Sequence, residues 1–204
     1  DVFITGSADV IREFREFERA STTTLAAFVQ PVIDRYLSRI EQRLTAERFG
    51  GRFTVMQSNG GRLPAEGMRR NAITALFSGP AAGVVGAVRQ AERSGYRNLI
   101  TFDMGGTSTD VCLVDEGQPA TTPDTEIDGL PIRTPVLDIV SVGSGGGSIV
   151  WVDDGGMLRV GPESAGADPG PACYGKGGKR PTITDAQVIV GAVRPEGFLG
   201  GKMA

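Results

Sequence analysis

Hydrophobic periodicity predicts helices at the start of the chain. From Asp9 to Leu44, apolar residues recur three and four positions apart, which is the spacing of one helix face. The hydroxyl run from Ser21 to Thr24 interrupts this pattern, and Pro31 is expected to kink the later part or to mark its true start. The pattern therefore predicts two helices that separate near residues 21–24.

After residue 50 the chain alternates short apolar runs with turns rich in glycine. Helices are expected at 78–92, with Ser78 as N-cap, and at 186–193, capped by Thr184 and Asp185. Pro131 and Pro135 indicate a connection, and 161–181 a long ordered loop. Strands are predicted at 53–57, 98–102, 111–114, 120–128, 137–142, 149–152 and 157–160. The predicted elements are therefore helices and short strands in alternation with turns.

Composition and charge narrow the choice of partners. The 204 residues suffice for one large or two small domains, and a net charge of −3 argues against nucleic acid or an anionic membrane surface as the main partner. No apolar run approaches the roughly 20 residues that span a bilayer. The two cysteines, Cys112 and Cys173, indicate no disulfide framework and fit a reducing cytoplasm.

The sequence contains no histidine, which excludes His-based zinc sites and Ser-His-Asp triads within this chain. Acid–base chemistry must then use carboxylates, Lys, Tyr, Cys or a group of the substrate. The chain has 30 glycines, about twice the usual share, and most of them follow residue 100. This clustering predicts several loops whose surface is formed by backbone groups, because glycine has no side chain.

One glycine-rich turn combines the features of a phosphate and metal site. The residues from Thr101 to Val111 form two short apolar runs around a tip of Gly105, Gly106, Thr107, Ser108 and Thr109. Backbone N–H groups and hydroxyls at such a tip can surround an anion, because glycine allows close approach. Asp103 and Asp110 flank the tip and can order Mg²⁺ or an attacking group. The alternative is a tight turn with solvated aspartates.

Two further glycine-rich segments have both a structural and a functional interpretation. Residues 78–83, with Gly79 and Gly83, either allow close helix–strand packing or place a helix N-terminus under a nucleotide. The loop at 144–148 is either a simple turn or a donor of N–H groups to a nucleotide. Its residues are Ser144, Gly145, Gly146, Gly147 and Ser148.

Other polar residues are weaker candidates. Cys173 lies in the 161–181 loop without a histidine partner, so a nucleophilic or metal-binding role is the less favoured interpretation. Three charged residues of that loop either contact substrate or are solvated, and two amides after residue 56 either face a cleft or bond locally in a turn. These are Glu163, Asp168, Lys176, Gln57 and Asn59.

Several blocks taken together resemble the hydantoinase A / 5-oxoprolinase family. The matching blocks are 13–23, 57–61, 78–83, 102–111, 143–149, 161–175 and 181–186. They include Gln57-Ser58-Asn59-Gly60-Gly61, Ser78-Gly79-Pro80-Ala81-Ala82-Gly83 and Asp103-Met104-Gly105-Gly106-Thr107. Their order and spacing hold over nearly the whole chain, and no single block would establish the resemblance.

The resemblance implies an α/β fold of the actin-like, sugar-kinase-like ATPase type, with two ribonuclease H-like lobes and nucleotide between them. Each lobe of such proteins starts with an Asp-x-Gly-Gly-Thr hairpin, and the sequence contains one. The chain is then expected to be an internal part of a longer protein. Residues 1–95 would complete the first lobe and 96–204 would form the core of the second. Such a segment, with half of the phosphate site, is expected to be inactive alone.

The resemblance also implies a reaction. It is ATP-dependent opening of a cyclic amide, of the hydantoin or 5-oxoproline type, through phosphoryl activation of the ring carbonyl. The implied cofactors are ATP and Mg²⁺, with a monovalent cation, and the implied partner is a hydantoinase B-like subunit or a linked equivalent domain. Two alternatives stay open: the ATP-using subunit of an acetone or acetophenone carboxylase, and a non-catalytic module that binds nucleotide or a partner.

Overall fold

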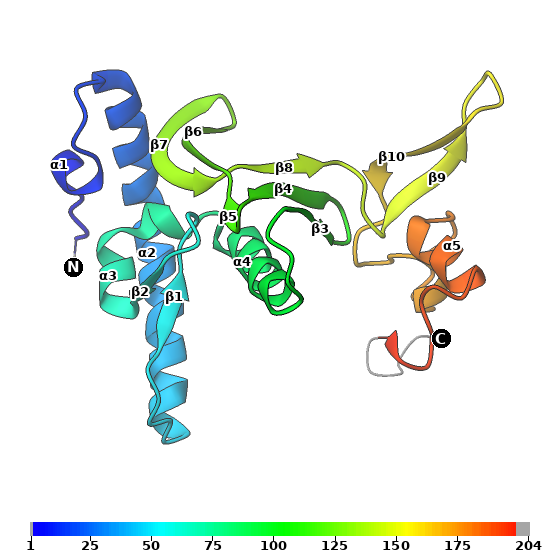
Figure 1. Cartoon of the computed structure of the whole chain (residues 1–204), viewed down its shortest axis with the longest axis horizontal. Coiled ribbons are helices and arrows are strands. Elements are labelled where there is room, and N and C mark those ends of the chain that lie inside the picture. The colour runs from blue at the N-terminus through cyan, green and yellow to red at the C-terminus, as the bar shows by residue number, and fades with distance from the viewer. Residues whose placement is uncertain (1, 199–204) are drawn as a thin grey trace. The chain divides into compact units, whose positions relative to one another are not determined.

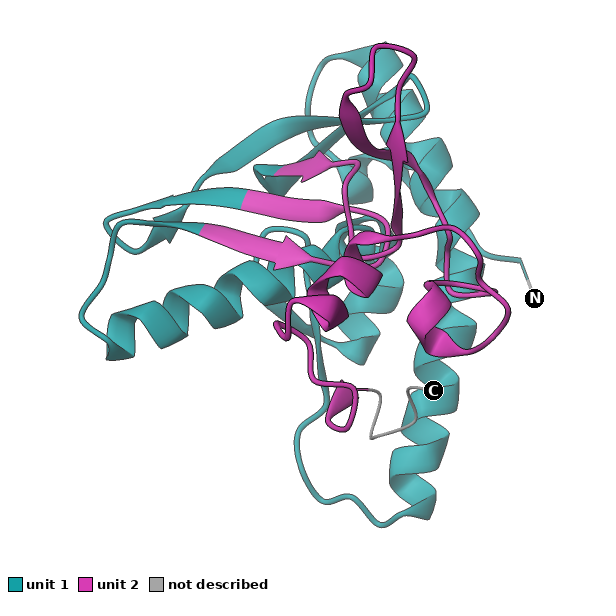
Figure 2. Cartoon of the chain, turned by 90° about the vertical axis from the view of Figure 1, so that its right-hand side faces the viewer, with its two compact units in different colours: residues 1–100, 112–139 teal, residues 101–111, 140–204 magenta. Residues whose placement is uncertain are grey.

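The computed structural model describes residues 2–198 and divides them into two compact units (Figure 2). Unit 1 comprises residues 1–100 and 112–139, and unit 2 comprises 101–111 and 140–204. Strands β3 (Leu99–Met104) and β4 (Thr109–Asp115) run from one unit into the other, so the tip that joins them belongs to unit 2. No helix in the described range is long and apolar enough to cross a membrane.

The N-terminal helices differ from the predicted pair. A short α1 (Ser7–Val10) precedes one continuous α2 (Glu16–Ala46), which includes residues 21–24 and Pro31 (Figure 1). The predicted interruption is wrong, and the hydroxyls of Thr22 and Thr23 donate to the carbonyls four residues earlier within the helix, each at 2.7 Å. Thr22 is also buried, and its hydroxyl accepts the N–H of Arg133 on β7 at 2.9 Å. Tertiary contacts thus stabilise a helix that local propensity disfavours.

Unit 1 continues with two short strands, three helices and three further strands (Figure 1). The elements are β1 (Thr54–Met56), β2 (Arg62–Pro64), α3 (Ala65–Arg70), the 3-10 helix η1 (Ala72–Ala75), α4 (Ser78–Arg93), β5 (Gln118–Pro119), β6 (Thr121–Ile127) and β7 (Leu130–Leu137). Pro131 and Pro135 lie inside β7, so the predicted connection is wrong. β6 and β7 form a two-stranded antiparallel sheet with a register shift, and proline is tolerated at edges and bulges.

Helix α4 forms where the sequence predicts it and buries one face. Ala81, Val84 and Val88 lie along that face and pack with Cys112, Val114 and Leu137 in the main core of unit 1. Ser78 is the first helical residue rather than the cap, which is Phe77 with no side-chain hydrogen bond.

Unit 2 contains the tip of the β3–β4 hairpin and the elements that follow residue 139. These are β8 (Ile139–Val142), β9 (Ser148–Val152), β10 (Leu158–Ser164), the 3-10 helix η2 (Ala172–Tyr174) and α5 (Ile183–Ile189). β9 and β10 form the predicted hairpin, whereas the predicted buried strand at 137–142 is divided after Leu137. Its second part, β8, pairs with β4 and exposes Val140 and Val142, because one face of this short strand is uncovered in the described chain.

The last helix begins earlier than predicted. Thr182 caps α5 through a capping box, in which its hydroxyl accepts the N–H of Asp185 and the Asp185 side chain accepts the N–H of Thr182. Thr184 is therefore a helical residue, and its side chain is free for another role.

Candidate functional site

The β3–β4 hairpin ends in a tip of four residues, 105–108. The N–H of Gly105 donates to the carbonyl of Ser108 at 2.8 Å and closes the turn. Asp103 lies exposed on β3 before the tip, and Asp110 lies half-buried on β4 after it. The structure thus confirms the hairpin predicted from the sequence.

The glycine-rich loop after β8 lies directly against this tip. The N–H of Gly146 donates to the carbonyl of Gly105 at 2.9 Å, and the N–H of Gly147 donates to the carbonyl of Gly106 at 2.7 Å. A Cβ atom on Gly145 would lie 2.7 Å from three backbone atoms of residues 106–108. Position 145 therefore needs glycine because the backbone of the loop touches the backbone of the tip. This is a packing role within the chain.

This contact fixes the direction of two peptide groups at the tip. In a planar trans peptide, the carbonyl and the following N–H point in opposite directions. The carbonyls of Gly105 and Gly106 point toward the loop, so the N–H groups of Gly106 and Thr107 point away from it. Neither of these N–H groups has a hydrogen-bond partner within residues 2–198, and both residues are exposed.

Further donors accompany these two N–H groups. The N–H of Ser108 and the hydroxyls of Thr107 and Ser108 are also without a partner in the described chain. Thr109 differs, because it is buried and its hydroxyl donates to the carbonyl of Ser144 at 2.5 Å. The exposed residues Gly106 and Thr107, with the half-buried Ser108 beside them, therefore leave a set of donors unused, which is the arrangement that binds anions.

The loop at 144–148 offers no comparable set of donors. All five of its N–H groups are hydrogen-bonded within the chain, to acceptors at Val142, Ser148, Gly105, Gly106 and Gly145 in turn. The sequence-based expectation of N–H groups available to a nucleotide does not match this arrangement. The structure gives residues Ser144 to Ser148 the geometry of a support for the tip.

The two carboxylates differ in their surroundings. The hydroxyl of Ser141 on β8 donates to Asp110 at 2.5 Å and holds that carboxylate, whereas Asp103 makes no hydrogen bond or ion pair in the described chain. The described residues contain no group of three acidic or cysteine side chains arranged for a metal ion. A cation here would be held by one or two carboxylates and by groups from outside the chain, a pattern typical of Mg²⁺ with phosphate.

The glycines of α4 are placed by the structure in unit 1. Gly79 and Gly83 are both exposed, on the face opposite Ala81 and Val84. A Cβ atom on Gly79 would meet nothing within 4 Å. Close packing within residues 2–198 therefore does not explain Gly79, and its role in nucleotide binding stays a prediction.

Cys173 is held as a protonated thiol. Burial, a hydrogen bond to Asp185 and the charge of Asp185 raise the pKa of Cys173 to about 11. The Asp185 carboxylate is partly buried, which opposes ionisation, but donors from Cys173 and Thr182 outweigh this and hold its pKa below the usual range. A thiol with so high a pKa is a poor nucleophile at neutral pH.

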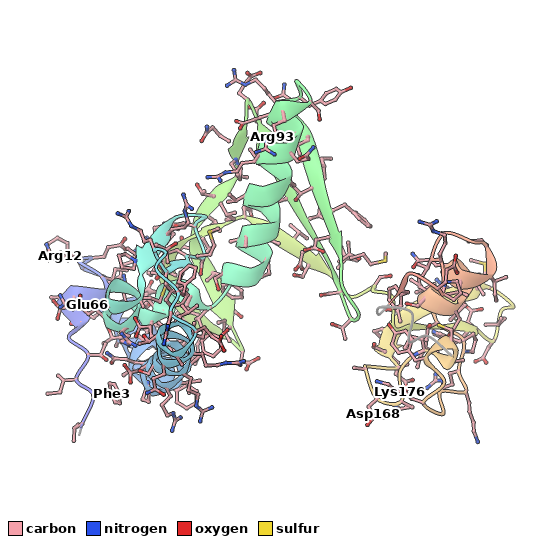
Figure 3. The ribbon with its side chains drawn as sticks, turned by 90° about the horizontal axis from the view of Figure 1, so that it is seen from below. Phe3, Arg12, Glu66, Arg93, Asp168 and Lys176 are labelled. Carbon is pink, nitrogen blue, oxygen red and sulfur yellow. The ribbon has the colours of Figure 1, made fainter. Side chains whose placement is uncertain are left out.

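The remaining polar candidates have local roles or are solvated. Glu163 forms an ion pair with Arg180 at 2.6 Å, and Asn59 accepts the N–H of Gly61 within its turn at 2.8 Å. Asp168 and Lys176 lie exposed on the loop after β10 (Figure 3), and neither forms an ion pair within the described residues. Gln57 donates to the Thr74 hydroxyl at 3.3 Å.

Sequence reasoning did not single out Ser141 or assign Thr184 a contact with the site. Ser141 is an isolated hydroxyl in an apolar strand, and only the pairing of β8 with β4 brings it to Asp110. Thr184 was expected to cap a helix, and its hydroxyl instead donates to the carbonyl of Gly146 at 2.8 Å. Both contacts join segments more than 30 residues apart in the sequence.

Comparisons with known proteins agree on one family. A model of the hydantoinase/oxoprolinase family matches residues 19–204. Caprolactamase subunit alpha of Pseudomonas jessenii is 42% identical over 205 residues, which cover 100% of this chain and 29% of that protein. The 5-oxoprolinase of Saccharomyces cerevisiae is 41% identical over 195 residues, which cover 94% of this chain and 15% of that protein. The chain thus spans less than a third of each of these relatives.

Two solved structures have the same fold over this region. The crystal structure of ATP-dependent caprolactamase from Pseudomonas jessenii matches with a TM-score of 0.77 and 41% identity, covering 100% of this chain and 30% of that one. The nucleotide-free structure of acetone carboxylase matches with a TM-score of 0.77 and 31% identity, covering 97% of this chain and 28% of that one.

Proposed function

Because the chain belongs to the hydantoinase/oxoprolinase family, we propose that it is part of an ATP-dependent hydrolase that opens cyclic amides. The observation that carries the proposal is the outward direction of the unpartnered N–H groups of Gly106 and Thr107, in a chain whose relatives include a caprolactamase subunit and a 5-oxoprolinase. The activity is proposed for the longer protein, since the chain spans 29% of the caprolactamase subunit.

The residues at the tip fit a nucleotide phosphate. The N–H groups of Gly106, Thr107 and Ser108 and two hydroxyls supply donors without a Cβ at Gly106 to block approach. Asp103 and Asp110 supply oxygen ligands for Mg²⁺ on either side of these donors. Ser144 to Ser148 hold the tip rather than the nucleotide, and Gly79 and Gly83 are left as candidates for nucleotide contact.

The chemistry follows from the weak reactivity of a ring amide. ATP held at this site would transfer its γ-phosphoryl group to the ring carbonyl oxygen, with ADP as the leaving group. Water would then attack the activated carbonyl carbon, the ring C–N bond would break, and phosphate would be released. The chain's contribution is positioning and charge neutralisation, which dominate catalysis of phosphoryl transfer. Donors at the tip stabilise negative charge on phosphate oxygens, and Asp103, which has no internal partner among the described residues, is the carboxylate free to bind the metal or orient the attacking group.

We place this chain in an actin-like, sugar-kinase-like fold as its wider architecture. In that arrangement residues 1–95 complete a first lobe, 96–204 form the core of a second, and a second hairpin of the same kind lies upstream. The mixed α/β elements and the hairpin at Asp103 to Asp110 support this assignment. A second subunit of the hydantoinase B type is the proposed partner, since the Pseudomonas jessenii relative is named a subunit.

A second candidate function is the ATP-using subunit of a ketone carboxylase. Its support is the match to acetone carboxylase, with the same TM-score as the match to caprolactamase. Phosphate release by the full-length protein with its second subunit separates the two. Release with hydantoins, 5-oxoproline or caprolactam supports the hydrolase, and release only with acetone plus bicarbonate supports the carboxylase.

Binding of ATP tests the site itself. Asp103→Asn is expected to lower turnover by at least about 100-fold if this carboxylate orders the metal or the attacking group. Asp115→Asn is the matched control, because Asp115 is an exposed aspartate on β4 beyond the tip. If calorimetry with ATP and Mg²⁺ shows no binding by the full-length protein, the ATP-dependent function is refuted. Binding without turnover on any substrate would favour a non-catalytic module.

A further inference from the structure

The first turn of α5 is tied to the loop that supports the hairpin tip. The N–H and the hydroxyl of Thr184 both donate to the carbonyl of Gly146, each at 2.8 Å. Thr184 is 5% exposed, so this carbonyl is satisfied inside the protein by one residue. Two donors from one residue fix the Gly146 carbonyl more firmly than one would.

Gly146 connects Thr184 to the tip through its two backbone polar groups. Its carbonyl accepts from Thr184, and its N–H donates to the carbonyl of Gly105 at 2.9 Å. A Cβ atom on Gly146 would lie 2.7 Å from the Thr184 hydroxyl, so the loop is held between α5 and the tip without spare room. The direction of the Gly105–Gly106 peptide therefore depends on the position of Thr184.

Thr184 is itself held in place by its neighbour in α5. Asp185 accepts the N–H groups of Thr182 at 2.9 Å and Cys173 at 2.8 Å, and the hydroxyl of Thr182 at 2.8 Å. These bonds join the start of α5 to the η2 turn. The first helical turn is thus anchored at two places, and Thr184 projects from it to the loop.

We propose that Thr184 is a positioning residue for the phosphate-binding tip, which it holds through Gly146 and without contact to the nucleotide. This inference rests on the proposed function, because it assigns the tip to phosphate. Thr184 fixes the loop, the loop holds the carbonyls of Gly105 and Gly106, and the N–H groups of Gly106 and Thr107 are directed outward before any ligand arrives. Loss of the hydroxyl leaves a single donor on Gly146 and a less ordered tip.

The test compares Thr184→Val with Thr184→Ser in the full-length protein with its second subunit. The matched control is Thr134→Val, which makes the same change at a buried threonine in unit 1. Hydrogen exchange without nucleotide reports on the N–H groups of Gly146 and Gly147, whose acceptors are carbonyls of the tip. Calorimetry measures the dissociation constant of ATP, and steady-state kinetics separate KM from kcat.

Thr184→Val is expected to speed exchange of the peptide containing Gly146 and Gly147 and to weaken ATP binding about tenfold, which corresponds to one hydrogen bond. Thr184→Ser, which keeps the donor, is expected to restore ATP binding to within about twofold. Thr134→Val should change neither measurement. The inference is overturned if Thr184→Val leaves the affinity for ATP unchanged, whether or not exchange in this peptide or thermal stability changes.

The outcomes for Thr184 and for the proposed function are distinguishable. If Asp103→Asn abolishes turnover while Thr184→Val binds ATP as the unmodified protein does, the positioning role fails and the function stands. If the unmodified protein does not bind ATP, the proposed function fails and the assignment to phosphate falls with it.

Discussion

Replacement of Gly145 by alanine tests the contact between the loop and the tip directly. The new Cβ atom would lie 2.7 Å from the carbonyl carbon of Gly106 and from the backbone nitrogens of Thr107 and Ser108. Non-bonded carbon atoms prefer about 3.5–4.0 Å, so the two backbones must separate by about 1 Å. None of these three atoms is on a flexible side chain, and the separation cannot be absorbed by a change of rotamer.

The cost follows from the bonds that this separation breaks. The bonds from Gly146 and Gly147 to the tip, now 2.9 and 2.7 Å, would lengthen beyond the range of a hydrogen bond. Two lost bonds at about 0.5–1.5 kcal/mol each, together with about 1 kcal/mol or more for overpacking, give a local destabilisation of about 2–4 kcal/mol. The N–H groups of Gly106 and Thr107 would then lose their fixed direction.

The assay is hydrogen exchange over residues 143–148, together with the dissociation constant of ATP, in the full-length protein. Gly145→Ala is expected to expose the N–H groups of Gly146 and Gly147 to exchange and to weaken ATP binding. Gly143→Ala is the control, because a Cβ atom at this position of the same loop meets nothing within 4 Å. If Gly145→Ala exchanges and binds ATP like Gly143→Ala, the proposed contact between loop and tip does not exist in solution.

Three further predictions, two on variants and one on the reactivity of a cysteine, concern other parts of the site. Gly106→Ala, where a Cβ atom meets nothing within 4 Å, should leave the melting temperature unchanged but weaken ATP binding in calorimetry, and unchanged affinity would argue against phosphate at the tip. Cys173, whose pKa is about 11, should react slowly with iodoacetamide at pH 7.5 and faster as the pH rises toward 11, so rapid alkylation at pH 7.5 would contradict its burial beside Asp185. Asp185→Asn should destabilise α5 by about 1–3 kcal/mol at pH 7. Folding lowers the pKa of Asp185 from 3.8, so the stability difference between the variant and the unmodified protein should shrink as the pH falls below about 4. If thermal unfolding still shows this stability difference at pH 2, the charge of Asp185 is not its cause.

The sequence was informative where a signal is local. Short apolar runs on either side of a glycine-rich turn identified the β3–β4 and β9–β10 hairpins, and the small-residue helix at Ser78 was placed correctly. It was misleading where long-range contacts decide the structure. Residues 21–24 are helical because Thr22 bonds to its own helix and to Arg133, more than 100 residues later in the sequence. No local pattern contains that information.

The glycines of the candidate site also show what a local sequence pattern does not contain. A sequence cannot distinguish a glycine that leaves room for a ligand from one that leaves room for another part of the chain, since both appear as Gly-Gly. The distance from a hypothetical Cβ atom separates them here: Gly106 faces open space, whereas Gly145 and Gly146 would meet protein atoms at 2.7 Å. The two glycine-rich segments therefore have different roles. The tip at 105–108 presents unused donors to solvent. The loop at 144–148 uses its N–H groups in hydrogen bonds within the chain, two of which hold the tip, so each segment needs a different measurement.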